Sequence, residues 1–125
     1  TQGHHWLDIQ KKLLIEYQKN KDFLEAAKIA SLISDALPHE AQVASISGRL
    51  YMRTQELALA TYYFRRAHLL APKNDSYQID LAHVEYLNQQ TVISLAHLNA
   101  VVKRSPNNER ARFFLNKVMT ETKQK

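Results

Sequence analysis

The feature that most constrains the fold of this chain is the even spacing of its three prolines. Pro38, Pro72 and Pro106 stand 34 residues apart, and each follows a helix-length pattern. A fixed period between about 20 and 50 residues is typical of proteins in which one structural unit stacks on copies of itself. Proline cannot continue a hydrogen-bonded helix, so each proline closes a unit. The spacing predicts three units and one further helix: residues 7–40, 41–74, 75–108 and 109–122.

The middle unit shows the internal pattern of the repeat most clearly. Leu57, Ala60 and Phe64 recur at helical spacing in its second half, and Gly48 and Tyr51 lie on a helical pattern in its first half. A short polar turn separates the two patterns, and such a turn forces consecutive helices to lie antiparallel. We therefore predict an all-α protein built from helix–turn–helix pairs.

Small residues recur where the two helices of a unit must approach each other. Gly48 and Ala82 stand at the eighth position of their units, and Ala26, Ala60 and Ser94 stand at the twentieth. Two helices cross closely only where the contacting side chains are small. We expect Gly48 to lie against Ala60, and added bulk at Ala60 to cost about 1–3 kcal/mol through overpacking.

The sequence marks the ends of the helices less clearly than it marks the repeat. Asn20, Lys21 and Asp22 mark the turn of the first unit, and Asp22 is a candidate N-cap. Residues 1–6 contain Gly3 and are expected to form a short, flexible and irregular segment.

Composition limits the class of protein. The chain of 125 residues suffices for one compact domain, and its lack of cysteine excludes disulfides and thiolate zinc sites. It has no apolar run of about 18 residues and no secretory-leader pattern, so no membrane insertion is expected. Both a cytoplasmic and a periplasmic location stay open. The net charge of +5 is concentrated in residues 41–74 and 109–125, which favours acidic partners.

No pattern of a catalytic or metal site is present. The sequence has no glycine-rich phosphate loop and no nucleophile elbow, so neither an enzyme nor a bound cofactor is expected. No metal is expected either, because the histidines show no metal-ligand spacing. Those considered are His4, His5, His68, His83 and His97.

The middle unit resembles the repeat of the tetratricopeptide repeat (TPR) family. The first unit departs from the family pattern at Leu14, which is large where a small residue is expected, and at Ala30, which is smaller than usual. We expect these two changes to compensate. The third unit departs at Glu85, which replaces a core tyrosine and is expected either at the rim or buried beside a base. The residues of the middle unit that carry the resemblance are Gly48, Tyr51, Ala60, Phe64, Ala67 and Pro72.

The resemblance implies a right-handed superhelix of three helix pairs and a capping helix, with a concave groove lined by the first helices. Members of the family are non-catalytic scaffolds or adaptors that bind a peptide or a helix of a partner protein there. The lining positions of this chain are basic with apolar patches, which suits an acidic or carboxylate-bearing partner. They are Lys11, Ile15, Lys19, Arg49, Met52, Arg53, Ile79, His83, Tyr86, Arg110, Phe113 and Lys117.

One subtype of the family clamps the C-terminal carboxylate of a chaperone, and this subtype is not expected here. Its five clamp positions read Lys11, Ile15, Ile46, Ser76 and Asp80 in this chain, and only Lys11 matches. Asp80 stands where the clamp requires arginine.

The sequence also bears on three further interpretations. Helical-repeat proteins also bind RNA, but Arg65 and Arg66 fall on a second helix without a row of aromatic residues, so nucleic acid is not expected. Self-association through the terminal units is an alternative, because Trp6, Ile9 and Phe113 are apolar. A role as an assembly module of a larger bacterial secretion, pilus or envelope system rests on analogy with the family.

Overall fold

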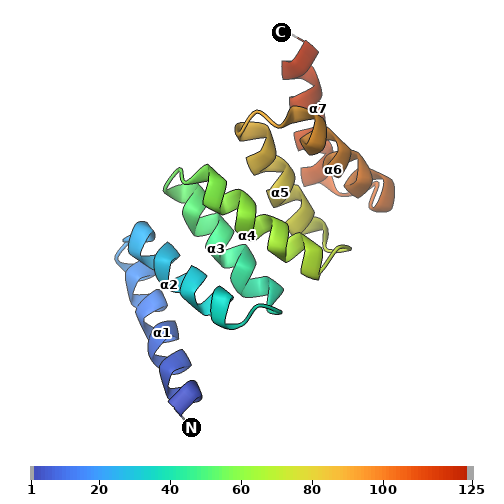
Figure 1. Ribbon diagram of the computed structural model, residues 1–125. Helices are drawn as coiled ribbons and strands as arrows, with labels where there is room; N and C mark the ends of the chain where they lie inside the picture. Colours follow the sequence, from blue (N-terminus) through green and yellow to red (C-terminus); the bar gives the residue numbers. More distant parts are fainter. Residues whose placement is uncertain (1, 124–125) are drawn as a thin grey trace.

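The computed structural model describes residues 2–123 and contains seven helices in that range. Figure 1 shows three antiparallel pairs followed by a single helix, so the predicted all-α architecture of helix pairs is confirmed. The helices are α1 (Gln2–Lys19), α2 (Phe23–Ala36), α3 (Ala41–Arg53), α4 (Leu57–Leu70), α5 (Asp75–Leu87), α6 (Thr91–Arg104) and α7 (Glu109–Lys123).

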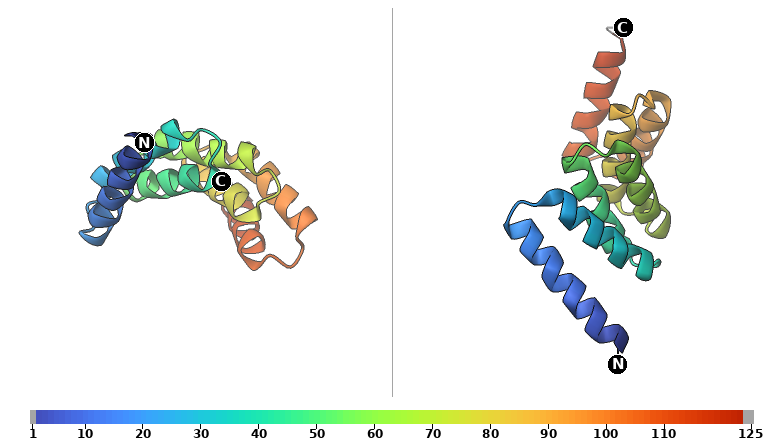
Figure 2. Two further views of the ribbon diagram at one scale, coloured as in Figure 1. Left: turned by 90° about the horizontal axis from the view of Figure 1, so that it is seen from below. Right: turned by 60° about the vertical axis from the view of Figure 1, so that its left-hand side comes forward.

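The pairs stack side by side into a curved array. Figure 2 shows the bend, with α3 on its inner side and α4 on its outer side. Each helix packs mainly on its neighbours in the chain, and α5 also touches α7. This nearest-neighbour packing is what a repeat architecture requires, because each unit buries its apolar face only against the next.

The turns inside the pairs repeat at the level of the backbone. Lys21, Gln55 and Gln89 all adopt left-handed conformations, with φ of 59°, 63° and 63°. The residue after each of them donates its backbone N–H to a carbonyl in the last turn of the preceding helix. For example, Glu56 donates to the carbonyl of Tyr51 at 2.9 Å. Glycine is the usual residue in such a turn, because a side chain strains this conformation. The repeat therefore keeps the shape of the turn without its preferred residue.

The two helices of the second pair cross closely at Gly48. Gly48 is buried, and a Cβ added there would lie 2.5 Å from Cδ1 of Phe64. The need for a small residue at Gly48 is confirmed, but its nearest neighbour is the Phe64 ring. The expectation that Gly48 also lies against Ala60 stays a prediction.

The departures in the first unit have a local explanation, and the third unit has a polar contact between its two helices. Leu14 and Ala30 are both buried in one apolar cluster with Ile33, so the large and small residues share one core. In the third unit the hydroxyl of Ser94 donates to the carbonyl of Ala82 at 2.6 Å. This bond lets α5 and α6 cross closely at a polar residue.

The helix ends differ from the sequence expectation in two places. Asp22 stands before α2, but its side chain makes no capping hydrogen bond, whereas Asn74 and Asn108 accept bonds from backbone N–H groups at 3.0 Å. The prediction of an irregular segment over residues 1–6 is wrong for residues 2–6, because α1 begins at Gln2. A single glycine costs a helix only about 1 kcal/mol, which the rest of α1 offsets. Thr1 lies outside the described residues.

No helix within residues 2–123 is both long and apolar enough to cross a membrane.

Candidate functional site

A large hollow lies on the inner side of the first two repeats. It has a volume of about 650 Å³ and is walled by α1, α3 and the C-terminal end of α2. The predicted groove residues Lys11 and Ile15 line it, and Ile15 is 53% exposed. We call this hollow the N-terminal pocket. Its other lining residues are Leu7, Leu14, Gln18, Ile33, Leu37, Glu40, Gln42, Val43 and Ile46.

A second hollow of about 230 Å³ continues this surface, because Gln18 and Ile46 line both. It also contains Arg53, whose guanidinium carbon lies 4.1 Å from the centre of the Phe23 ring. A cation held over an aromatic face is attracted by the ring's electrons and keeps its outer N–H groups available. Among the ion pairs found within residues 2–123, none involves Arg53. It therefore offers a positioned positive charge at the edge of the groove.

The middle of the inner face is organised by an acidic residue. Asp80 on α5 is nearly buried, and its two carboxylate oxygens accept hydrogen bonds from Arg49 of α3, at 3.5 Å, and from Arg110 of α7. Three successive inner helices are thus joined by one carboxylate. Two of the predicted cationic groove residues are partly neutralised inside the chain.

The C-terminal end of the inner face is aromatic. The ring of His83 lies 4.7 Å from that of Phe114, and Arg110 lies over the same ring at 5.6 Å. Burial lowers the pKa of His83, and the charges of Arg110 and Lys117 lower it further. His83 is therefore neutral at neutral pH. Phe113 is 63% exposed and lines a separate hollow of about 300 Å³ with Lys117.

Three predicted groove residues take up positions in or against the core. Ile79 is 1% exposed and packs against Val101 and Ala111, so its assignment as an apolar anchor for a partner is wrong. The expectation that the first helices line the groove does not hold at Ile79, because α6 and α7 pack over this part of α5. Met52 and Tyr86 are half-buried and pack against core clusters, and Lys19 is exposed at the end of α1.

Sequence reasoning missed several contributors to the surface. Leu37 lies at the end of α2, the second helix of the first pair, whereas the predicted lining residues all belong to first helices or to α7. Val43 and Leu7 occupy lining positions that were not considered, although Leu7 lies four residues before the predicted Lys11 and thus on the same face of α1. Asp80 was noted only as a mismatch to a carboxylate clamp, and its role between two arginines depends on the stacking of repeats.

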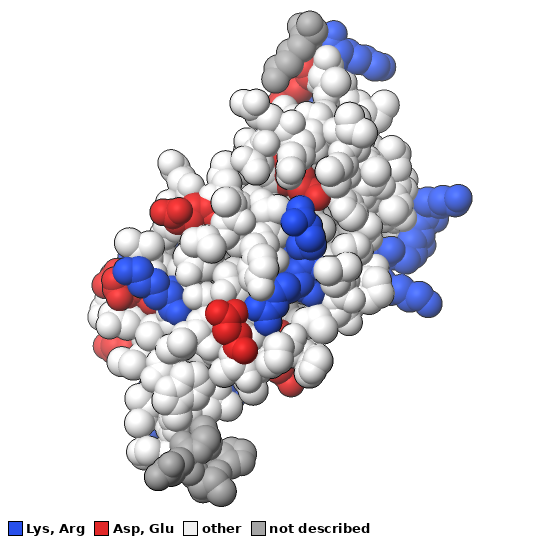
Figure 3. All heavy atoms as spheres, in the orientation of Figure 1, with Lys and Arg blue, Asp and Glu red and all other residues white. Residues whose placement is uncertain are grey.

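The outer face has a different character. Figure 3 shows the side covered by α2, α4 and α6, with basic side chains over the middle of α4 and a broad uncharged area beside them. Arg66 there donates to Asp35 at 2.8 Å and to the carbonyl of Ser34 at 3.0 Å. This cation is held by the chain's own acceptors. Among the side chains that the structure describes, residues 5–123, no group of three or more histidine or acidic residues could hold a metal ion, and His4 lies outside them.

Comparison with known proteins identifies the architecture. No model of a protein family matches the sequence, and no curated protein matches it either. Among solved structures, the chain is similar to the first TPR of Spaghetti (RPAP3) bound to the HSP90 peptide SRMEEVD, with a TM-score of 0.79 and 19% identity, over 91% of this chain and 90% of that one.

Two further solved structures are similar to this chain over most of its length. The P58(IPK) TPR domain has a TM-score of 0.85 at 13% identity, and the match covers 95% of this chain but 33% of that one. The Yersinia enterocolitica type III secretion chaperone SycD, in complex with a peptide of the translocator YopD, has a TM-score of 0.78 at 10% identity, over 94% and 95% of the two chains. Together with the repeated helix pairs, these similarities show that this chain has the tetratricopeptide-repeat fold.

Proposed function

We propose that the protein is a non-catalytic scaffold that binds a peptide or a helix of a partner protein on its inner face. The observation that carries this proposal is the N-terminal pocket, an apolar hollow of about 650 Å³ continued by the Arg53–Phe23 surface. Ligand pockets of roughly 300–1,000 Å³ with mostly apolar walls and a few polar groups are the usual form of a binding site. An apolar hollow with a basic edge can hold an apolar side chain while the edge orients a charged neighbour.

The geometry favours a particular distribution of contacts. Large apolar side chains of the partner would enter the N-terminal pocket beside Ile15, and acidic groups would lie near Lys11 and Arg53. The centre of the groove is less suited to an acidic group, because Asp80 already accepts from Arg49 and Arg110. We therefore place the acidic preference at the first two repeats.

The solved structures with this fold support the proposal by analogy. RPAP3 is shown with a peptide of HSP90 and SycD with a peptide of YopD. Placing the protein in a bacterial secretion, pilus or envelope assembly rests on this analogy of fold alone.

The proposal is tested by selecting a random peptide library on the immobilised chain. We expect enrichment of peptides that combine a large apolar residue with Asp or Glu. Ile15→Asp should weaken binding of the selected peptides at least tenfold, because it places a charge in the apolar hollow. Val92→Asp is the matched control, since Val92 is 82% exposed on α6. No enrichment, or equal loss in the two variants, would contradict the proposal.

A second candidate function is self-association through the first helix. Trp6, Ile9 and Leu13 recur at helical spacing on α1 and are 37%, 43% and 38% exposed. A row of apolar side chains on a terminal helix is what a further stacked helix would cover. Light scattering after gel filtration should then show a dimer that Ile9→Asp converts to a monomer. A monomeric wild-type chain at high concentration would remove this candidate.

A further inference from the structure

A buried acid lies between the second and third repeats, outside the inner face. Glu85 on α5 is 1% exposed. Its Oε2 lies 3.8 Å from Nε2 of His97 on α6, and its Oε1 has no hydrogen-bond partner within residues 2–123. A buried carboxylate normally receives several hydrogen bonds or a close ion pair, because its charge is costly to remove from water. The surroundings of Glu85 provide neither.

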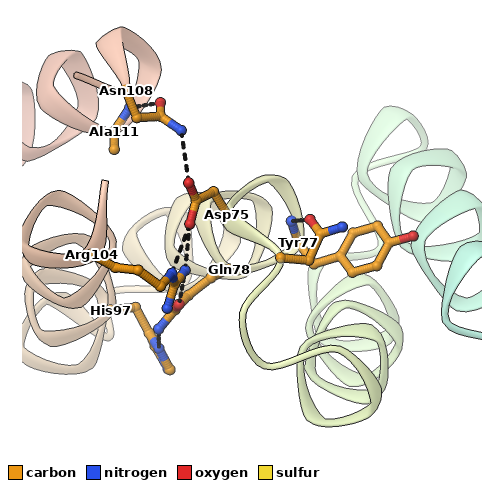
Figure 4. Close-up of polar contacts among 8 residues, drawn as sticks. Asp75, Tyr77, Gln78, His97, Arg104, Asn108 and Ala111 are labelled. Atoms are coloured by element: carbon orange, nitrogen blue, oxygen red, sulfur yellow. Dashed lines mark hydrogen bonds and ion pairs between the residues drawn. The ribbon is translucent and has the colours of Figure 1, made fainter. Parts of the chain in front are cut away.

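A chain of polar contacts fixes the proton on the neighbouring imidazole. Figure 4 shows it running from Asp75 through Arg104 and Gln78 to His97. Arg104 can only donate, so its bond of 3.0 Å identifies the Gln78 oxygen as the acceptor. The Gln78 amide nitrogen therefore donates to Nδ1 of His97 at 3.0 Å. Because Nδ1 accepts, neutral His97 carries its proton on Nε2, the atom that faces Glu85.

The same arrangement opposes a positive charge on His97. A second proton would sit on Nδ1 and would meet the donating amide of Gln78. His68 of α4 packs edge-on against His97, with ring centres 5.1 Å apart, and its buried Nδ1 has no hydrogen-bond partner within residues 2–123. Neither imidazole is therefore placed to become the strong cationic partner that an ionised Glu85 would need.

The charged and titratable groups that act on this cluster come from three helices. They are Arg65 and His68 of α4, Asp75 and Glu85 of α5, and His97 and Arg104 of α6. Burial raises the pKa of Glu85 to about 7, although the charge of Arg65 acts in the opposite direction. Burial lowers the pKa of His97, and His68 and Arg65 lower it further. Burial also lowers the pKa of His68, and the charge of Arg104 lowers it further.

We propose that Glu85 is a proton-linked switch that couples the packing of α4, α5 and α6 to pH near neutrality. The neutral acid is accommodated between the repeats, and the carboxylate loosens them. The second and third repeats are thus held most firmly while Glu85 is protonated and both imidazoles are neutral.

The sign of the pH dependence follows from the pKa directions. The folded-state pKa of Glu85 lies above its ordinary value of 4.5, so its contribution to stability is full below that value and is lost as pH rises through about 7. The two histidines have pKa values below 6.5, so their contribution is full above 6.5 and is lost as pH falls. Stability should therefore pass through a maximum slightly below pH 7.

The switch also bears on the inner face, because α5 carries His83 and Tyr86 on either side of Glu85. A looser α5 would displace these two side chains. This consequence rests on the proposed peptide groove, whereas the switch itself does not.

The test measures folding and needs no partner. Urea unfolding of the whole chain would be followed from about pH 5 to about pH 8.5, together with the carboxyl-carbon NMR titration of Glu85. We expect the wild-type unfolding midpoint to rise with pH up to its maximum slightly below pH 7 and to fall above it, and the Glu85 signal to titrate near pH 7. Glu85→Gln should fold, keep the histidine-dependent loss at low pH, lack the fall above about pH 7, and exceed the wild type at high pH.

Glu16→Gln, at an exposed position on α1, is the matched control and should keep the wild-type profile. The proposal is overturned by a Glu85 titration below about pH 5, by equal slopes in wild type and Glu85→Gln, or by failure of Glu85→Gln to fold. A failed peptide selection would leave all these readings unchanged, so the two proposals fail separately.

Discussion

The two halves of the array use their polar residues differently. The inner face of the first two repeats keeps an apolar hollow and leaves Lys11 and Arg53 without an internal acidic partner among the described ion pairs. Further along, Asp80 of the third repeat joins Arg49 of the second repeat to Arg110 of α7, and Asp75 pairs with Arg104 at 2.6 Å. One repeat architecture thus offers its charges to a partner at one end and uses them for its own stacking at the other. A count of basic residues along the groove hides this division.

The largest expected effect tests the crossing on which both halves depend. Ala60 is fully buried in the second repeat, and Ala60→Leu should lower the free energy of unfolding by about 1–3 kcal/mol through overpacking. Gln55→Leu in the exposed turn adds a similar apolar side chain outside the core and should cost much less. Thermal unfolding of the two variants measures the difference, and equal melting temperatures would refute the assigned packing.

The next largest effect compares one arginine from each half of the array for its contribution to peptide binding. Arg53→Gln should weaken binding of selected acidic peptides about tenfold, which corresponds to roughly 1.4 kcal/mol. The reason is that the Arg53 guanidinium is held over the Phe23 ring at the groove edge and takes part in none of the described ion pairs. Arg110→Gln should change affinity by less than about threefold, because Arg110 is engaged by Asp80. Fluorescence anisotropy with a labelled peptide compares the two. A larger loss at Arg110 would reverse the comparison.

A smaller effect should appear when the internal acid of the later repeats is removed. Asp80→Asn keeps the shape of the side chain but releases Arg49 and Arg110 from its charge. We expect affinity for acidic peptides to rise about threefold, with binding of uncharged peptides unchanged. Anisotropy with matched Glu- and Gln-containing peptides gives the reading. Weaker acid binding would mean that Asp80 positions the arginines for the partner.

The smallest effect concerns the turns that the two halves share. Gln55→Gly should stabilise the fold by roughly 0.5–1 kcal/mol, because glycine removes the strain of a positive φ of 63°. Lys12→Gly, at an exposed helical position, should have the opposite sign and a similar size. Urea unfolding distinguishes them, and destabilisation by both would count against strain in the turn.

Local features of this structure could be predicted from the sequence, and contacts between repeats could not. The prolines, Gly48 and the apolar spacing specify helix pairs because they act within one unit. The left-handed turn at Gln55 is not visible, since glutamine gives no signal for a positive φ. The burial of Ile79 under α7 and the bridge through Asp80 depend on how units stack, which a residue pattern within one unit does not describe.

The central claim, that a partner is held by the first two repeats, is tested most directly by methyl NMR of the chain with a selected peptide. Ile15 and Ile46 line the N-terminal pocket, whereas Val118 is buried on α7. We predict that the methyl signals of Ile15 and Ile46 shift on binding and show contacts to the apolar residue of the peptide, while Val118 stays in place. Contacts confined to the Phe113 surface of α7, with Ile15 and Ile46 unchanged, would contradict the account.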